Sequence, residues 1–181
     1  MNQDTLKQQE SPCPAPILVL GMGNILLQDE GLGIRALEAL QRDYALPPGV
    51  ELLDGGTTGM GLLDDIGGRE HVLVLDAVQT GEPPGTLVAM RGDRVPVYFG
   101  IRVTPHQLGL SDVLATLELS GEQPGSVTVL GLVPLSLELS LELSGAIEAK
   151  LPELVDLAVN ELTQLGYAPK KKGPDTFIAE D

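Results

Sequence analysis

Three residues of metal-binding type follow predicted strands or open a predicted helix. Glu30 follows the apolar run 17–20 after a glycine-containing loop, and Asp76 comes directly after the apolar run 72–75. His106 stands at the start of a predicted helix. Two carboxylates and one imidazole can bind a divalent transition metal and leave coordination positions open for water or substrate. Together the three residues predict a metal site, provided that the fold brings them to one place.

Each of the three residues also has a purely structural interpretation. Glu30 can complement the N-terminus of a helix, and Asp76 can stabilise the turn after its strand. His106 can be a solvated or hydrogen-bonded residue in the first turn of its helix. Asp54, which follows the apolar run 50–53 and precedes a glycine pair, is a further acid of the same kind.

The glycine loop at 21–23 also allows a dinucleotide-binding interpretation. A Gly-x-Gly after a strand, with Asp54 at the end of the next strand, is half of that fingerprint. The third glycine is replaced by Leu26, and the helix is predicted to begin late, near Asp29. A pyrophosphate would then lie far from the helix N-terminus, so a dinucleotide-binding domain is the weaker alternative.

These residues depend on an α/β arrangement of alternating strands and helices. Apolar runs without polar alternation are typical of parallel strands that are covered on both faces, whose carboxyl ends gather ligands at one edge. The predicted strands are 17–20, 50–53, 72–75, 86–90 (an antiparallel edge strand) and 126–132. The predicted helices are 31–44, 62–66, 104–119 and 145–165, the last with a kink at Pro152.

A single domain at 17–166 accounts for these elements, between flexible tails at 1–16 and 167–181. Within it, the segment 135–144 reads LSLELSLELS, and this strict alternation by itself indicates a strand. His71 precedes its strand at the amino end, away from the other candidates. No HExxH or Gly-x-Ser-x-Gly motif competes for the catalytic role.

Composition excludes several classes of protein. The 181 residues carry a net charge of −15 and no tryptophan, which argues against nucleic-acid binding. A single cysteine, Cys13, rules out an internal disulfide. No apolar run is long enough to cross a membrane, and the first residues lack the apolar core of a signal peptide. We expect a cytoplasmic protein without membrane insertion.

Five sequence blocks resemble one family in consistent order across residues 17–166. The blocks are GMGNILLQDEGLG (21–33), LLDGGTTGMGLLDDI (52–66), VLDAVQTGEPPGT (74–86), TPHQLGLSDVL (104–114) and GLVPLSLE (131–138). Together they resemble the NiFe-hydrogenase maturation endopeptidases, and the PHQLGL segment is similar to the hydrogenase-2-type members.

The resemblance implies a three-layer αβα sandwich with a twisted, mostly parallel five-stranded sheet. It implies a cytoplasmic endopeptidase that removes the C-terminal extension of a nickel-loaded hydrogenase large-subunit precursor. It also implies Glu30, Asp76 and His106 as the metal residues, and segment 135–144 as a connection rather than a strand. We follow it on that segment, and we expect the free protein to be monomeric.

The resemblance leaves the chemistry open. Nickel would arrive with the substrate, and cadmium or zinc could replace it in a crystal. Members of the family are commonly grouped as aspartic-type proteases, which makes Asp76 and Asp54 the catalytic candidates. Asp76 with Asp54 or Glu30 could supply a base, or the nickel could polarise the peptide carbonyl. A non-proteolytic chaperone that binds nickel sites is the alternative.

Overall fold

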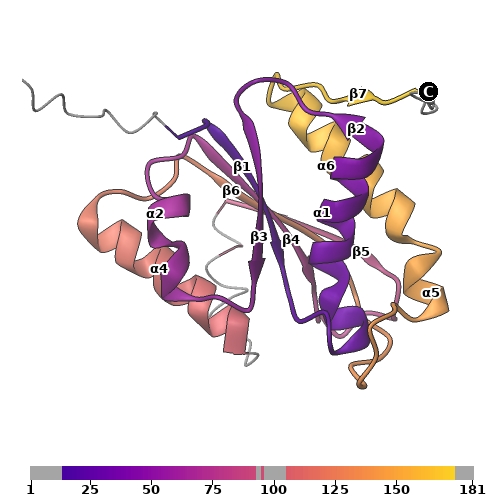
Figure 1. Cartoon of the computed structure of the whole chain (residues 1–181). Helices are drawn as coiled ribbons and strands as arrows, with labels where there is room; N and C mark the ends of the chain where they lie inside the picture. The colour runs from indigo at the N-terminus through magenta and orange to yellow at the C-terminus, as the bar shows by residue number, and fades with distance from the viewer. Residues whose placement is uncertain (1–13, 93–94, 96–104, 174–181) are drawn as a thin grey trace, which may run out of the picture.

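A five-stranded sheet forms the centre of the molecule in the computed structural model (Figure 1). The structure describes residues 14–92, 95 and 105–173, with the backbone alone at 105–108. The strand order is β3-β1-β4-β6-β5, and all neighbours are parallel except β5, which runs antiparallel to β6 at one edge. The strands are β1 (Ile17–Met22), β3 (Val50–Gly56), β4 (His71–Ala77), β5 (Leu87–Arg91) and β6 (Val127–Leu132). The predicted sheet, including its antiparallel edge strand, is confirmed.

Helices cover both faces of this sheet and complete the three layers (Figure 1). One face packs against α1 and α6, and the other against α2 and α4. The helices are η1 (Gln28–Gly31), α1 (Leu32–Asp43), η2 (Met60–Leu62), α2 (Leu63–Ile66), α4 (Pro105–Ser120), α5 (Gly145–Glu148) and α6 (Leu151–Gln164). The described part of the chain contains no helix long and apolar enough to cross a membrane.

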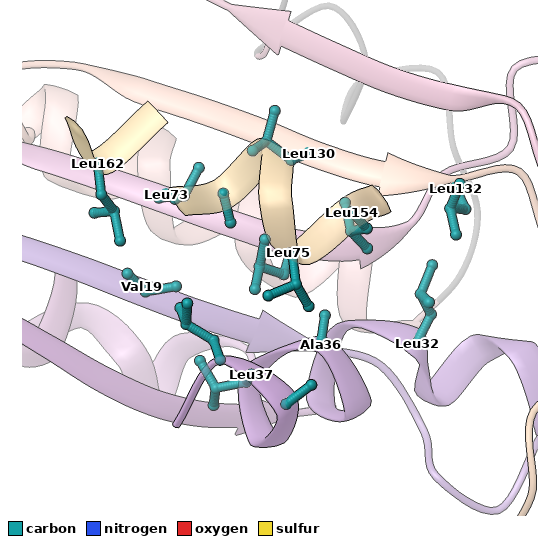
Figure 2. Packing of buried hydrophobic residues seen from close by; sticks show 14 of the residues in the cluster. Val19, Leu32, Ala36, Leu37, Leu73, Leu75, Leu130, Leu132, Leu154 and Leu162 are labelled. Carbon is teal, nitrogen blue, oxygen red and sulfur yellow. The ribbon is translucent and has the colours of Figure 1, made fainter. Parts of the chain in front are cut away.

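Two apolar clusters explain why the central strands carry apolar side chains on both faces. Successive side chains of a strand point to opposite faces. In β4, Leu73 and Leu75 join the cluster under α1 and α6, whereas Val72 and Val74 join the cluster under α2 and α4. Figure 2 shows the first cluster, in which side chains from β1, β4 and β6 meet those of α1 and α6.

The last helical segment differs from its prediction. The sequence predicts one helix over 145–165 with a kink at Pro152, but the structure has two helices, α5 and α6. Pro152 lies in the first turn of α6, where its missing N–H has no helical partner to lose. The proline therefore begins a new helix instead of bending one. Gly166 follows the C-cap of α6 with φ +90°, the left-handed conformation in which glycine commonly ends a helix.

Part of the tail predicted at 167–181 pairs with the domain. Strand β7 (Lys170–Lys171) pairs antiparallel with β2 (Tyr44–Ala45), and the Lys172 N–H donates to the carbonyl of Asp43 at 2.8 Å. This pairing packs residues 167–173 on the domain. The sequence shows only a lysine run here and does not reveal the pairing, because backbone groups and not side chains make the contact. The remaining tail residues, 1–13 and 174–181, lie outside the described residues.

His71 starts β4 at the amino edge of the sheet, as predicted, and is only 4% exposed. Its Nδ1 lies 2.6 Å from the Ser126 hydroxyl, and its Nε2 has no hydrogen-bond partner in the described part of the chain. Burial lowers the pKa of the His71 imidazole below its ordinary value. Glu161 acts in the opposite direction and Arg91 adds to the lowering.

We expect His71 to make stability depend on pH. The unfolded chain binds this proton with a pKa near 6.5, whereas the folded chain binds it only at lower pH. Between the two pKa values the unfolded state carries more protons. The free energy of unfolding should therefore fall as pH drops below about 6.5, by at most about 1.4 kcal/mol per pH unit for one proton.

Urea unfolding at a series of pH values measures this slope. The difference in stability between the wild type and His71→Gln removes the contribution of the carboxyl groups that both proteins share. That difference should change between about pH 7 and pH 5, because only the wild type titrates at this position. A difference that is independent of pH would show that His71 does not carry the effect.

Candidate functional site

Asp76 lies near the carboxyl end of β4, opposite Gly131 of β6, and is 1% exposed. Its Oδ1 accepts a hydrogen bond from the Ala77 N–H at 2.8 Å. Val74 and Val78 on either side belong to the cluster under α2 and α4. Because side chains alternate along a strand, Asp76 faces the same side of the sheet, which α4 covers.

Gly131 allows the close contact between β6 and the end of β4. A Cβ at this position would lie 2.1 Å from the carbonyl oxygen of Asp76 and 2.6 Å from Cγ2 of Val78. Any side chain would therefore push the two strands apart beside Asp76. The close pairing of β4 and β6 at Asp76 thus requires glycine at residue 131.

Glu30 lies in η1, which packs against β4 and leaves the side chain 7% exposed. Two glycines permit this approach. A Cβ at Gly23, where φ is +125°, would lie 1.8 Å from the carbonyl oxygen of Glu30, and a Cβ at Gly33 would lie 2.1 Å from that of Leu75. The turn that carries Glu30 is thus pressed onto the carboxyl ends of β1 and β4. The structure brings Glu30 and Asp76 to the same edge of the sheet.

His106 lies in the first turn of α4, and its side chain is outside the described residues. The helix begins in the lower part of Figure 1, where the parallel strands end. One turn further along, the backbone of Gly109 touches the loop after β3, since a Cβ there would lie 2.6 Å from Cα of Gly59. The start of α4 therefore adjoins the carboxyl edge.

The predicted three-residue metal site stays a prediction. Among the side chains that the structure describes, no group of three metal-binding residues is close enough to hold an ion. That set includes Glu30 and Asp76 but not His106. The backbone supports the predicted convergence at the level of elements, because η1, the end of β4 and the start of α4 share one edge.

Asp54 occupies a different place from Asp76. It lies in β3 opposite Gly21, which on its other side pairs with Leu75, so Asp54 faces the α1 side of the sheet. The backbone thus directs Asp54 and Asp76 to opposite faces, which does not favour a proton shared between them. Asp54 is exposed, and its Oδ1 accepts a hydrogen bond from the Gly56 N–H at 2.9 Å. It lines an open hollow of about 340 Å³ together with Ile25, Leu26 and other residues.

Asp29 is a structural residue of the site that the sequence analysis did not identify. Its carboxylate is fully buried and accepts four hydrogen bonds from the connection between β6 and α5. The donors are the N–H groups of Leu135 (2.9 Å), Ser136 (3.0 Å) and Ser144 (2.7 Å), and the hydroxyl of Ser144 (2.8 Å). Its hydrogen-bond partners are more than 100 positions away in sequence. Its position next to Glu30 was therefore the one sequence feature that could have identified Asp29 as part of the site.

The segment 135–144 is a connection, as the resemblance implies and against its period-2 pattern. Its one strand-like contact is a bridge between Ser140 and Leu27. The serines of the pattern serve as local hydrogen-bond partners: the Ser140 hydroxyl, for example, accepts from the Glu142 N–H at 3.1 Å. The leucines between them are mostly exposed, so no sheet face is formed.

A dinucleotide site is not supported at the first strand. Helix α1 begins at Leu32, and the η1 turn separates it from the end of β1 at Met22. The space directly after the first two glycines is filled by the chain itself, because Gly23 contacts the carbonyl of Glu30. A pyrophosphate therefore has no helix N-terminus close to the strand end.

The fold is that of a known class of α/β protease. The family model described as hydrogenase maturation protease matches residues 34–161. The chain belongs to the hydrogenase maturation protease family. The matched span contains Asp54, Asp76 and His106 and begins after Glu30.

Individual relatives agree with the family. The hydrogenase 2 maturation protease of Escherichia coli is 44% identical over 151 residues, covering 83% of this chain and 92% of the relative. The hydrogenase expression/formation protein HupD of Rhodobacter capsulatus is 42% identical over 149 residues, covering 82% and 70%. The solved structure of the hydrogenase maturating endopeptidase HybD from E. coli superposes with a TM-score of 0.83 at 43% identity, covering 86% of this chain and 97% of that one.

Replacement of Asp29 by asparagine should destabilise the protein strongly, although the two side chains have nearly the same shape. Asp29→Asn keeps the shape but replaces one acceptor oxygen with a donor, which opposes the N–H groups around it. We expect a loss of about 3 kcal/mol in the free energy of unfolding. Glu138→Gln, which makes the same change of charge on an exposed residue of the same connection, should cost less than about 0.5 kcal/mol. Equal losses in urea unfolding would contradict the role of Asp29.

Proposed function

We propose that this chain is the endopeptidase that removes the C-terminal extension from a nickel-loaded NiFe-hydrogenase large-subunit precursor. The observation that carries the proposal is the placement of Asp76, an almost completely buried carboxylate, at the carboxyl edge of the sheet in a member of the hydrogenase maturation protease family. Glu30 lies at the same edge. The names of the relatives support a hydrogenase precursor as the substrate.

Nickel enters this proposal as part of the substrate. We propose that Glu30, Asp76 and His106 complete the coordination of a nickel ion that the precursor already holds. Carboxylate and imidazole are suitable donors for this ion, and zinc or cadmium could occupy the same ligands because ligand type discriminates weakly among such ions. The nickel would then mark a precursor as ready for cleavage.

Asp76 is the preferred base of the reaction. Its carboxylate would accept a proton from the attacking water as the water oxygen bonds to the peptide carbonyl carbon. Asp76 would then give this proton to the leaving amine as the C–N bond breaks, which restores the carboxylate. Asp54 faces the other side of the sheet, so its proposed role is confined to the wall of the hollow where the peptide approaches. The aspartic-type grouping would then rest on Asp76 alone.

The proposal extends to the compartment and the state of the free protein. The cytoplasm is the proposed compartment, in keeping with a chain that has one cysteine and no internal disulfide. We also propose that the free protein is a monomer. A non-proteolytic chaperone using the same three ligands is the second candidate, because the sequence contains no recognised nucleophile motif.

The mass of the large subunit tests the proposed function directly. Incubation of the protein with nickel-loaded precursor should shorten the subunit by the mass of its extension. A precursor prepared without nickel should stay intact, because it offers no ion for Glu30, Asp76 and His106. A complex that forms on nickel-loaded precursor without any loss of mass would favour the chaperone.

The catalytic role of Asp76 makes a separate prediction. Asn has no basic oxygen, so Asp76→Asn should still associate with the nickel-loaded precursor but cleave it at least about a hundredfold more slowly. Asp54→Asn makes the same substitution on the opposite face and should cleave within about tenfold of the wild type. Column co-elution and single-turnover cleavage measure the two properties. Near-normal cleavage by Asp76→Asn would remove it as the base.

A further inference from the structure

A group of large apolar side chains is exposed next to the proposed site. They lie on the loop after β1 and on the connection between β6 and α5, and we call them the leucine patch. Its members, with their exposed fractions, are Ile25 (40%), Leu26 (52%), Leu135 (54%), Leu137 (39%), Leu139 (85%) and Leu141 (60%). Apolar side chains gathered in this way on the surface of a folded protein commonly mark a site of interaction.

The two segments of the leucine patch are joined through their backbones. The Ser140 N–H donates to the carbonyl of Leu26 at 3.1 Å, and the Gln28 N–H donates to the carbonyl of Ser140 at 3.0 Å. Arg35 of α1 adds a hydrogen bond to the carbonyl of Leu141 at 2.8 Å. With the four hydrogen bonds to Asp29, these contacts hold the patch in place before any partner binds. A preformed surface loses little conformational entropy on binding.

The leucine patch adjoins both the hollow beside Asp54 and the turn that carries Glu30. Ile25 and Leu26 also line the hollow that contains Asp54. Asp29, which holds the connection, is the immediate neighbour of Glu30, and both belong to η1. A peptide that reaches from the carboxyl edge over this hollow would arrive on the patch.

Charge and form indicate what kind of partner fits. Glu138 and Glu142 are exposed among the leucines, and the chain as a whole carries −15. A suitable partner combines apolar side chains with lysine or arginine. A folded subunit buries most of its large apolar side chains, whereas a short terminal extension can offer them in an extended form.

We propose that the leucine patch docks the C-terminal extension of the precursor, as an extended peptide that carries apolar and basic side chains. This inference rests on the proposed function and adds the surface that selects the extension. The extension would lie on the patch while the bond to be cut lies at the carboxyl edge. The patch contributes binding and takes no part in the chemical step.

The test compares cleavage kinetics of full-length variants on nickel-loaded precursor. Replacing Leu139 and Leu141 together by serine should raise KM at least about tenfold and leave kcat within about twofold. Leu119→Ser is the matched control, because Leu119 is 90% exposed near the end of α4, away from the patch. An unchanged KM in the double variant, or an equal rise in Leu119→Ser, would overturn the inference.

A second measurement identifies the occupant. A synthetic peptide with the sequence of the extension should inhibit cleavage by the wild type and should be at least about tenfold weaker against the double variant. A peptide that inhibits neither protein, while KM still rises in the variant, would assign the patch to the body of the subunit and overturn the proposal. If the wild type cleaves the precursor and the patch variant behaves like the wild type, the docking proposal is wrong and the proposed endopeptidase function is retained. If the wild type leaves the precursor uncut, the endopeptidase function and the docking proposal are both wrong.

Discussion

The buried carboxylate of Asp29 joins the two parts of the molecule on which the functional edge depends. A charge without access to water is costly unless hydrogen bonds compensate it, and four donors from a distant connection do so at this position. The bonds fix η1 on one side and residues 135–144 on the other. Because Glu30 follows Asp29 directly, the same contacts position a proposed metal ligand and the exposed leucines. The interaction is structural, yet both of the proposed binding functions require it.

Close backbone packing is the second condition for the site. Gly33 and Gly131 lie against the carbonyl oxygens of Leu75 and Asp76, and Gly59 touches Gly109. Side chains at these positions would separate α1 and β6 from the end of β4, and α4 from the loop after β3. The close packing at this edge buries the side chains of Glu30 and Asp76. Burial restricts the motion of these carboxylates. Such restricted positions suit groups that must coordinate an ion or orient a water molecule.

The sequence was informative where a pattern is local and failed where contacts are distant. Continuous apolar runs identified the central strands because both faces of the sheet are covered, and the helix predicted over 104–119 corresponds to α4. The alternation over 135–144 indicated a strand, but its serines bond locally and its leucines remain exposed. The role of Asp29 and the packing of residues 167–173 depend on partners more than 100 positions away, and no spacing rule reveals them. The opposite orientation of Asp54 and Asp76 follows only from the strand register.

X-ray absorption at the nickel edge, recorded on the precursor alone and in complex with this chain, tests the central claim most directly. The claim is that Glu30, Asp76 and His106 together complete the coordination of nickel that the precursor holds. The complex of the wild-type chain, trapped at low temperature before cleavage, should show added oxygen and nitrogen scatterers in the first shell of the ion. They should lie at about 2.0–2.2 Å, the range for carboxylate and imidazole ligands of a comparable divalent ion. The His106→Ala complex should lack the imidazole contribution. A first shell that is identical with and without this chain would contradict the claim.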